Sequence, residues 1–250
     1  MTRVGIGIDI GGSGIKGALV DLDAGEFIGE RHRIPTPTPS TPKAVAKTCV
    51  KIVKELGGPE DAPIGIAMPA PMRHNIIGFM ANLDQGWVGK DAKKIYEKQL
   101  GRPVTVLNDA DAAGVAECAF GAAKNVMGTV IVTTLGTGIG SALIYNGILV
   151  PNTELGHLEL DGRDAETHAS AKQRTKYDLS WKEWGGRLDR YYNFLEMLFS
   201  PDRIVVGGGV SKNHEEFLKY IQLKDAEIVP AELFNTAGIV GAAYYADQQS

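Results

Sequence analysis

The 250-residue sequence predicts an α/β fold built from two similar halves around a cleft. Strand-like segments alternate with amphipathic helices, which favours parallel strand pairing. Each half also contains a strand, a glycine-rich turn and a second strand, seen in GGSGIKGALV at 11–20 and LGTGIGSALI at 135–144. Either these segments are related and line the cleft from both sides, or glycine-rich hairpins resemble one another by coincidence.

The first half is expected to begin with three strands, at 4–10, 18–22 and 26–31. A strand rather than a helix follows the glycines at 12–17, so their G-x-G-x-x-G spacing does not form a dinucleotide-binding loop. A helix then begins near Thr41-Pro42 and ends at Gly57. A strand at 63–68, a helix at 91–100 and a strand at 104–107 complete the alternation.

The second half is expected to contain strands at 129–134, 141–145 and 148–150, the last two joined by an Asn146-Gly147 turn. A capping box at Ser180 starts a helix that ends before Pro201. Its apolar face comprises Trp184, Leu188, Tyr191, Leu195 and Leu198. A strand and glycine turn follow at 204–209, and a final helix at about 236–247. We expect one lobe at 1–110, with 237–250 packing back on it, and a second at 111–236.

Composition narrows the class of protein. A net charge of −4 argues against broad nucleic-acid binding, although it allows a local basic groove. The two cysteines, Cys49 and Cys118, are far apart, so neither a disulfide framework nor a cysteine-based zinc site is expected. No apolar run is long enough for a membrane span, and MTRVGIGIDI does not look like a signal peptide. We therefore expect a cytoplasmic protein.

Glycine turns between strands can hold phosphate, because their backbone amides form an anion-binding concavity without any helix. Lys16 adds a positive charge to the first turn, and Ser13 and Thr137 add hydroxyl donors. Asp9, at the end of the first strand, can orient Mg²⁺. The alternative for each loop by itself is a purely structural turn. The two related loops together with Gly207, Gly208 and Gly209 favour a site for a phosphate donor.

The segment after the strand at 104–107 offers a candidate general base. Asp109 follows the carboxyl end of that strand, where ligands usually bind in α/β folds. It can accept the proton of a substrate hydroxyl, or it can cap the helix that follows, and the pattern does not decide between these roles. Asp111 fits an electrostatic or capping role in the first helical turn.

Glu154 and His157 are three residues apart with a glycine between them, so both can point into one pocket. Sugars require such paired acceptors and donors, because their hydroxyls lie at fixed angles. A zinc site is not expected here, since no cysteine follows.

Taken together, these motifs resemble the ROK family of sugar kinases, which has the actin-like (ribonuclease H-like) fold. The resemblance rests on DIGGSGIK at 9–16, NDADAA at 108–113, LGTGIG at 135–140, ELGH at 154–157 and GGGVS at 207–211. A closer resemblance, to actinobacterial polyphosphate glucokinases, rests on TPTP at 36–39, ANLD at 81–84, LELDGRDAE at 158–166 and LFSP at 198–201.

The resemblance implies an enzyme that transfers phosphate from polyphosphate, and also ATP, to the 6-hydroxyl of glucose, with mannose as a further acceptor. It implies Asp109 as catalytic base, with sugar held by Asn82, Asn108, Asp109, Glu154, His157 and Glu166. Mg²⁺ would bind at Asp9. Phosphate would be held by Gly11, Gly12, Ser13, Gly14, Lys16, Thr134, Gly136, Thr137, Gly138, Gly207, Gly208 and Gly209. A homodimer is expected, without nucleic-acid or membrane partners.

The sequence departs from the family pattern in two places. The cysteine cluster that binds zinc in many members is replaced by LDGRDAETHAS at 160–170, so no structural zinc is expected. Ala70-Pro71 stands where the family usually has glycine, which puts strict sugar specificity in doubt.

Three questions stay open at this level. An ATP-only hexokinase is the alternative enzyme, and a sugar-sensing repressor or non-catalytic sugar-binding protein is the alternative from another class. Polyphosphate would also need a basic path, for which the candidates are Lys124, Arg163, Lys172, Arg174 and Lys176. The residues at 171–178 can equally form a solvated helix face.

Overall fold

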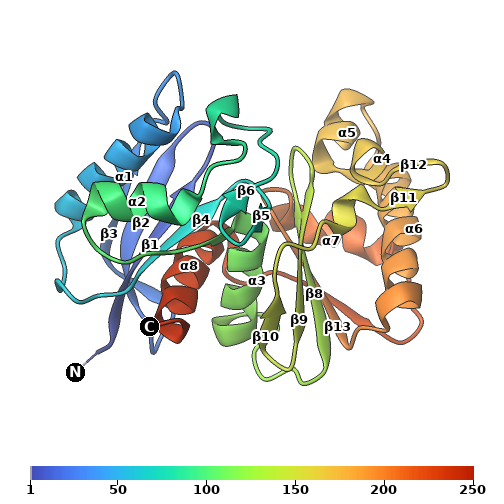
Figure 1. The fold of residues 1–250 in the computed structure, drawn as a ribbon. Coiled ribbons are helices and arrows are strands. Elements are labelled where there is room, and N and C mark those ends of the chain that lie inside the picture. Colours follow the sequence, from blue (N-terminus) through green and yellow to red (C-terminus); the bar gives the residue numbers. More distant parts are fainter. Residues whose placement is uncertain (1) are drawn as a thin grey trace. The chain divides into compact units, whose positions relative to one another are not determined.

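The computed structural model describes residues 2–250 and divides into two compact units (Figure 1). Unit 1 comprises residues 2–116 and Thr236–Ser250, and unit 2 comprises Glu117–Asn235. Helix α3 (Asp109–Phe120) runs across this division, and the boundary expected after residue 110 falls in the same helix. No helix among residues 2–250 is long and apolar enough to span a membrane.

The sheet of unit 1 has five strands in the order β3-β2-β1-β4-β7. The strands are β1 (Val4–Ile10), β2 (Ile15–Asp21), β3 (Glu26–Ile34), β4 (Ile64–Met68) and β7 (Thr105–Asn108). Neighbouring strands among β1, β2 and β3 are antiparallel, and β4 is parallel to both β1 and β7. The predicted three-strand opening is confirmed. Strand β2 begins earlier than predicted, because Ile15 pairs with Ile10 directly after the glycines.

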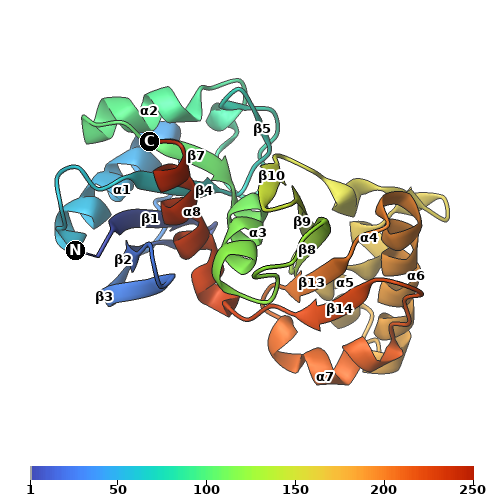
Figure 2. The same ribbon diagram turned by 90° about the horizontal axis from the view of Figure 1, so that it is seen from below.

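Helices α1 (Pro42–Leu56) and α2 (Ala92–Leu100) cover one face of this sheet, and α8 (Ala237–Gln248) packs on the other (Figure 2). The alternation of glycine and isoleucine in β1 explains this arrangement. Ile6, Ile8 and Ile10 are buried in the core beneath α1 and α2. On the opposite face a Cβ at Gly7 would lie 2.0 Å from the carbonyl oxygen of Ile239 in α8. Only glycine permits so close an approach.

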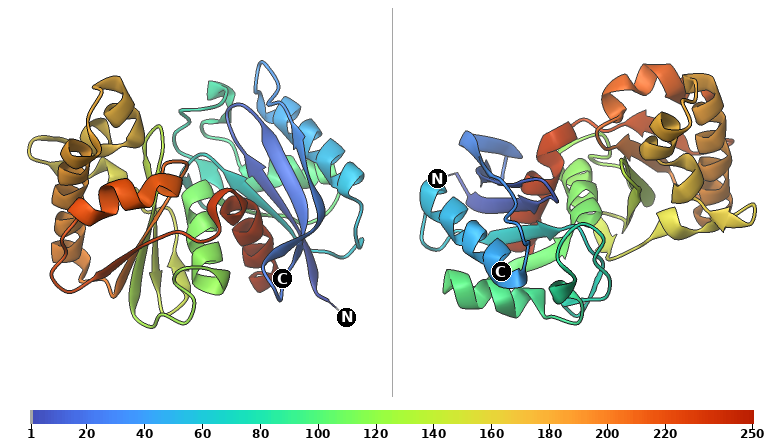
Figure 3. Two further views of the ribbon diagram at one scale, coloured as in Figure 1. Left: turned by 180° about the vertical axis from the view of Figure 1, so that it is seen from behind. Right: turned by 90° about the horizontal axis from the view of Figure 1, so that it is seen from above.

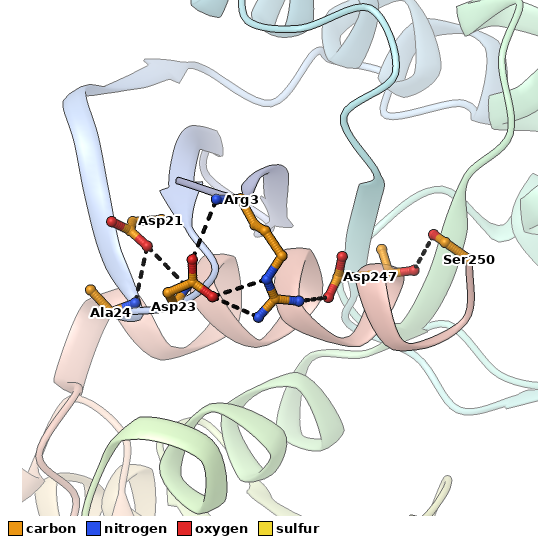
Figure 4. Close-up of polar contacts among 7 residues, drawn as sticks. Arg3, Asp21, Asp23, Ala24, Asp247 and Ser250 are labelled. Carbon is orange, nitrogen blue, oxygen red and sulfur yellow. Dashed lines mark hydrogen bonds and ion pairs between the residues drawn. The ribbon is translucent and has the colours of Figure 1, made fainter. Parts of the chain in front are cut away.

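Arg3 ties the C-terminal helix to the start of the chain (Figure 4). Its Nη1 lies 2.7 Å from an oxygen of Asp247, and its Nη2 lies 2.8 Å from an oxygen of Asp23. The two carboxylates raise the pKa of Arg3, and Arg3 in turn lowers the pKa of Asp23. All three side chains are accessible to solvent, so salt screens these pairs.

The sheet of unit 2 has the order β10-β9-β8-β13-β14, with the same succession of antiparallel and parallel pairs as in unit 1. Its strands are β8 (Thr129–Leu135), β9 (Ile139–Tyr145), β10 (Ile148–Val150), β13 (Arg203–Gly207) and β14 (Glu227–Pro230). The predicted turn between β9 and β10 is present, with positive φ at Asn146 and Gly147. The two units therefore repeat one topology.

Helices α6 (Trp181–Phe199) and α7 (His214–Phe217) pack on one face of the second sheet (Figure 3). The capping box between Ser180 and Glu183 is present. Four of the five predicted apolar-face residues are buried, but Leu198 is 48% exposed. The prediction was wrong for Leu198, because Phe199, and not Leu198, packs against the buried cluster in the last turn of α6, where Leu198 and Met197 are exposed.

Several short elements were not predicted. They include β5 (Met72–Arg73), β6 (Ile76–Ile77), β11 (Glu159–Leu160), β12 (Arg163–Asp164), β14 and α4 (Glu166–Ala169). Helix α5 (Ala171–Lys176) lies in the segment for which a solvated helix face was the alternative. Strands β5 and β6, and β11 and β12, form two separate two-stranded ribbons. Elements this short contain too few residues to show a hydrophobic period.

Candidate active site

In unit 1 the glycine turn between β1 and β2 is closed by a hydrogen bond from the Gly11 amide to the Gly14 carbonyl, 3.0 Å. Thr36, in the proline-rich connector, donates its hydroxyl to the Gly11 carbonyl at 2.5 Å. Gly12 and Ser13 are exposed at the tip. Within residues 2–250 the amides of Gly12 and Ser13 have no protein acceptor, so they remain available to an anion.

Charged side chains from three adjacent strands gather beside this turn. Asp9 on β1 is paired with Lys16 on β2, and Lys16 with Arg33 on β3. The Lys16 Nζ lies 3.2 Å from one carboxylate oxygen of Asp9. Arg33 donates to the Ser13 carbonyl at 3.1 Å. Arg33 was not predicted as a site residue, and only the strand register, which places it opposite Lys16, could have indicated it.

Asn82 also lies at this turn. A Cβ on Gly12 would be 3.3 Å from the Asn82 carbonyl oxygen and 3.7 Å from its Cβ. The structure thus brings Asn82, predicted to bind sugar, to the tip of the turn predicted to bind phosphate. Ala70, where the family usually has glycine, is 2% exposed and is not among the residues with positive φ.

Asn108 and Asp109, where β7 meets α3, have different surroundings and contacts. Asn108, 8% exposed, accepts the amides of Ala110 at 2.8 Å and Asp111 at 3.3 Å through its side-chain oxygen. Asn108 therefore caps α3. Asp109 is exposed at the first residue of the helix, with one oxygen 2.9 Å from the Ala110 amide. The capping role that competed with catalysis at Asp109 is therefore filled by its neighbour.

Asp111 is placed differently from Asp109. It is 1% exposed, and its carboxylate contributes to raising the pKa of Tyr245 in α8, after the larger effect of burial. Asp111 therefore belongs to the packing between α3 and α8, as its predicted electrostatic role implies.

In unit 2 the turn between β8 and β9 is one residue shorter than the turn between β1 and β2. It is closed by a hydrogen bond of 3.0 Å from the Gly136 amide to the Gly138 carbonyl. Thr134 is half-buried at the end of β8, and Thr137 is exposed at the tip. Among residues 2–250 the amides of Thr137 and Gly138 have no protein acceptor. Gly208 packs against this turn, because its Cβ would lie 2.4 Å from the Leu135 carbonyl oxygen.

The Glu154–His157 segment is fixed against β9 by two features. Ser141 accepts the Leu155 amide at 2.9 Å and donates to the Thr153 carbonyl at 2.7 Å. A Cβ on Gly156 would lie 2.1 Å from the Ile139 carbonyl oxygen. Glycine is therefore required between Glu154 and His157, and both side chains are held near the glycine turn.

His157, Asp164 and Glu166 converge in unit 2, with ligand atoms within 4.8 Å of one another. His157 Nδ1 lies 2.7 Å from Asp164, and this hydrogen bond is the main reason why the His157 pKa is raised. Burial raises the pKa of Glu154, with Glu166 adding to the effect and His157 opposing it. Asp164 was missed from sequence, because the β11–β12 ribbon that presents it was not predicted.

Glu166 contacts the glycine turn directly. Its carboxylate accepts the Ile139 amide at 3.1 Å, and a Cβ on Gly138 would lie 2.2 Å from the same oxygen. Glu166 and His157, predicted to bind sugar, therefore lie beside Gly138, predicted to bind phosphate. In unit 1, the structure likewise groups Asp9, Lys16 and Asn82 around the other turn.

Comparisons with known proteins identify the family of the chain. Residues 5–176 match the model of the ROK family.

The chain belongs to the ROK family.

Among its relatives, the polyphosphate glucokinase of Mycobacterium tuberculosis is 46% identical over 96% of this chain and 90% of its own. The crystal structure of the inorganic polyphosphate/ATP-glucomannokinase from Arthrobacter sp. strain KM is 50% identical, with a TM-score of 0.91 over 99% of this chain and 100% of that one.

A ROK family glucokinase from Streptomyces griseus, solved with glucose and AMPPNP, is 25% identical with a TM-score of 0.82, covering 98% of this chain and 99% of that one. The family and the actin-like fold expected from the motifs are thus confirmed. The repeated sheet topology of this ROK protein is the structural basis of that fold.

Proposed function

We propose that this protein transfers a phosphoryl group from inorganic polyphosphate, and also from ATP, to the 6-hydroxyl of glucose, with mannose as a second acceptor. The names of the M. tuberculosis and Arthrobacter relatives support both the donor and the acceptor. The observation on which the mechanism depends is the exposed Asp109 beside a helix cap that Asn108 already provides.

In the proposed reaction Asp109 accepts the proton of the sugar hydroxyl as that oxygen attacks the terminal phosphorus of the donor. The bond from that phosphorus to its bridging oxygen breaks, and the shortened polyphosphate, or ADP, leaves with that oxygen. A base of this kind suits phosphoryl transfer, which needs positioning and charge neutralisation more than covalent catalysis. The other hydroxyls of the sugar are held by Asn82, Asn108, Glu154, His157 and Glu166. The donor phosphates are held by the amides of both glycine turns, together with Lys16, Ser13, Thr134, Thr137 and Gly207–Gly209.

Asp9 fits Mg²⁺ as a carboxylate ligand. Mg²⁺ in kinases is usually held by one or two carboxylates together with substrate phosphates and water. Lys16 lies near only one of the two Asp9 oxygens, and Asp9 is half-buried beside the phosphate-binding turn. When bound there, the ion would neutralise charge on the transferring phosphates.

Rate measurements with glucose and Mg²⁺ test the proposal, using ATP or long-chain polyphosphate as donor. Turnover with both donors is expected. No turnover with either would reject the kinase function, and turnover with ATP alone would leave an ATP-only hexokinase. That second candidate is supported by the S. griseus glucokinase, which was solved with an ATP analogue.

The proposal also includes a cytoplasmic homodimer. Light scattering of the purified protein tests the dimer, for which a monomeric mass would be the contrary result. Fractionation of the source cells tests the location, and recovery outside the cytoplasm would contradict it.

A further inference from the structure

We propose that the exposed lysines of α5, Lys172 and Lys176, bind the polyphosphate chain beyond the phosphates held by the glycine turns. This inference rests on the proposed function, because it assigns residues to the extended part of that donor. It selects one segment from the basic candidates that the sequence offers.

The position of α5 is the first observation. The Lys172 amide donates to the Gly136 carbonyl at 3.0 Å, so the helix begins at the glycine turn of unit 2 (Figure 1). The next two amides of that turn, at Thr137 and Gly138, have no acceptor among residues 2–250. A phosphate chain held by those amides therefore passes near the start of α5.

The charge of α5 is the second observation. Residues 171–178, AKQRTKYD, contain three basic side chains and one acidic one in a protein of net charge −4. Lys172 and Lys176 are four residues apart, so they lie on the same face of the helix. Both are exposed, and neither forms an ion pair within the described chain. The face therefore carries two ammonium groups that no carboxylate neutralises.

The fixed attachment of α5 is the third observation. The Arg174 guanidinium stacks 3.5 Å from the centre of the Trp181 ring in α6, and Trp181 in turn stacks on Phe217. Arg174 Nε is buried without a hydrogen-bond acceptor in the described residues. Arg174 therefore acts through packing and holds α5 on α6. Because the helix is fixed, its lysines lose less conformational freedom when they bind an anion.

These observations favour a long polyanion over a nucleotide as the ligand of this face. ATP carries three phosphates, whereas polyphosphate carries a negative charge on every further unit. Additional cations therefore benefit only the longer donor. We expect a preference that grows with chain length and weakens as salt screens the exposed ammonium groups.

The test compares Lys172→Gln/Lys176→Gln with the control Lys219→Gln/Lys224→Gln. Lys219 and Lys224 are exposed lysines of the same unit, and each is paired with a carboxylate, of Glu216 and Asp225 respectively. Each double variant replaces two lysines, so both lose the same charge. For the α5 variant, KM for long-chain polyphosphate should rise roughly tenfold at low salt. KM for tripolyphosphate, ATP and glucose should change less than about twofold. The rise should diminish at high salt.

Thermal unfolding of both variants separates binding from folding, and unchanged transitions are expected because the replaced side chains are exposed. An equal rise in the control, or an equal rise with ATP or tripolyphosphate, would overturn the assignment to α5. Wild-type turnover with ATP alone would also overturn it while leaving the kinase function intact. If neither ATP nor polyphosphate supports turnover, the proposed function itself is rejected.

Discussion

The two glycine hairpins have the same backbone framework but different side chains. In unit 1 the last paired positions before the turn include Asp9 opposite Lys16, and in unit 2 the corresponding positions are Thr134 opposite Gly140. The first hairpin therefore carries its own charges. The second gains a carboxylate, Glu166, from a segment far along the chain.

This difference indicates how a repeated framework acquires separate roles. Strand pairing and glycine turns supply anion-binding amides in both units, because these depend on the backbone alone. Metal binding and sugar recognition require particular side chains, which differ between the copies. We propose that unit 1 supplies the base and the metal ligand, and that unit 2 supplies most of the sugar contacts.

The largest expected effect comes from removing the base of unit 1. Asp109→Asn should lower kcat by roughly 10²- to 10⁴-fold, the usual contribution of a general base, because the amide cannot accept the proton. Glucose binding should change little, since Glu154, His157 and Glu166 remain. Steady-state kinetics and calorimetric titration with glucose measure the two quantities.

The control for this variant is Asp61→Asn, which removes an exposed carboxylate from a turn of the same unit. It should retain normal kcat. A rate within a few-fold of wild type for Asp109→Asn would reject Asp109 as the base and would remove the division of roles proposed above.

A smaller effect should distinguish the two hairpins through their glycines. Gly138→Ala places a Cβ 2.2 Å from a Glu166 oxygen, so that carboxylate must move. The contact is with the end of a flexible side chain, so the loss in unfolding free energy should stay below about 1 kcal/mol. Displacement of the Glu166 carboxylate should raise KM for glucose. Gly136→Ala is the matched control, because nothing lies within 4 Å of its added Cβ. Denaturant unfolding and glucose kinetics provide the measurements.

The corresponding change in unit 1 is Gly14→Ala, whose Cβ would meet the guanidinium of Arg33 at 2.6 Å. Arg33 is a long, flexible side chain, so it can shift at a cost of less than about 1 kcal/mol. An equal rise in KM for glucose with Gly14→Ala and Gly138→Ala would contradict the distinction between the hairpins, as would such a rise with Gly136→Ala.

Local patterns predicted much of the fold. Three features could be predicted because each depends on only a few neighbouring residues. They are the glycine–isoleucine alternation of the strand at 4–10 and the helix N-termini at Thr41-Pro42 and at Ser180. The repeat was also visible, because its two segments have nearly the same spacing. Leu198 was misplaced because Leu198 and Phe199 are adjacent apolar residues, and periodicity alone does not show which of them faces the core.

The candidate site was less predictable, because its contacts join segments that are distant in sequence. Arg33 lies at the turn only through the β2–β3 register. Asp164 reaches His157 through a ribbon of two short strands, which shows no periodic pattern. The choice between capping and catalysis at Asp109 needed the side-chain geometry of Asn108.

The smallest expected effect concerns the pairing of His157 with Asp164, which has no counterpart at the unit 1 turn. Asp164→Asn should move the His157 pKa down toward its ordinary value, because their hydrogen bond is the largest cause of the rise. Glu154 and Glu166 also raise that pKa and remain in the variant, so part of the rise should persist. NMR titration of the His157 ring measures the change.

The same pair should make stability depend on pH. The folded pKa of His157 lies above its ordinary value of 6.5, so its stabilising contribution is complete below about that pH and is lost as pH rises through the folded pKa. The difference in unfolding free energy between wild type and Asp164→Asn should therefore shrink over that range. His168 is the internal reference, because its lowered pKa arises from burial and from Arg187 and Arg163. An unchanged His157 titration in the variant would show that Asp164 does not control this histidine.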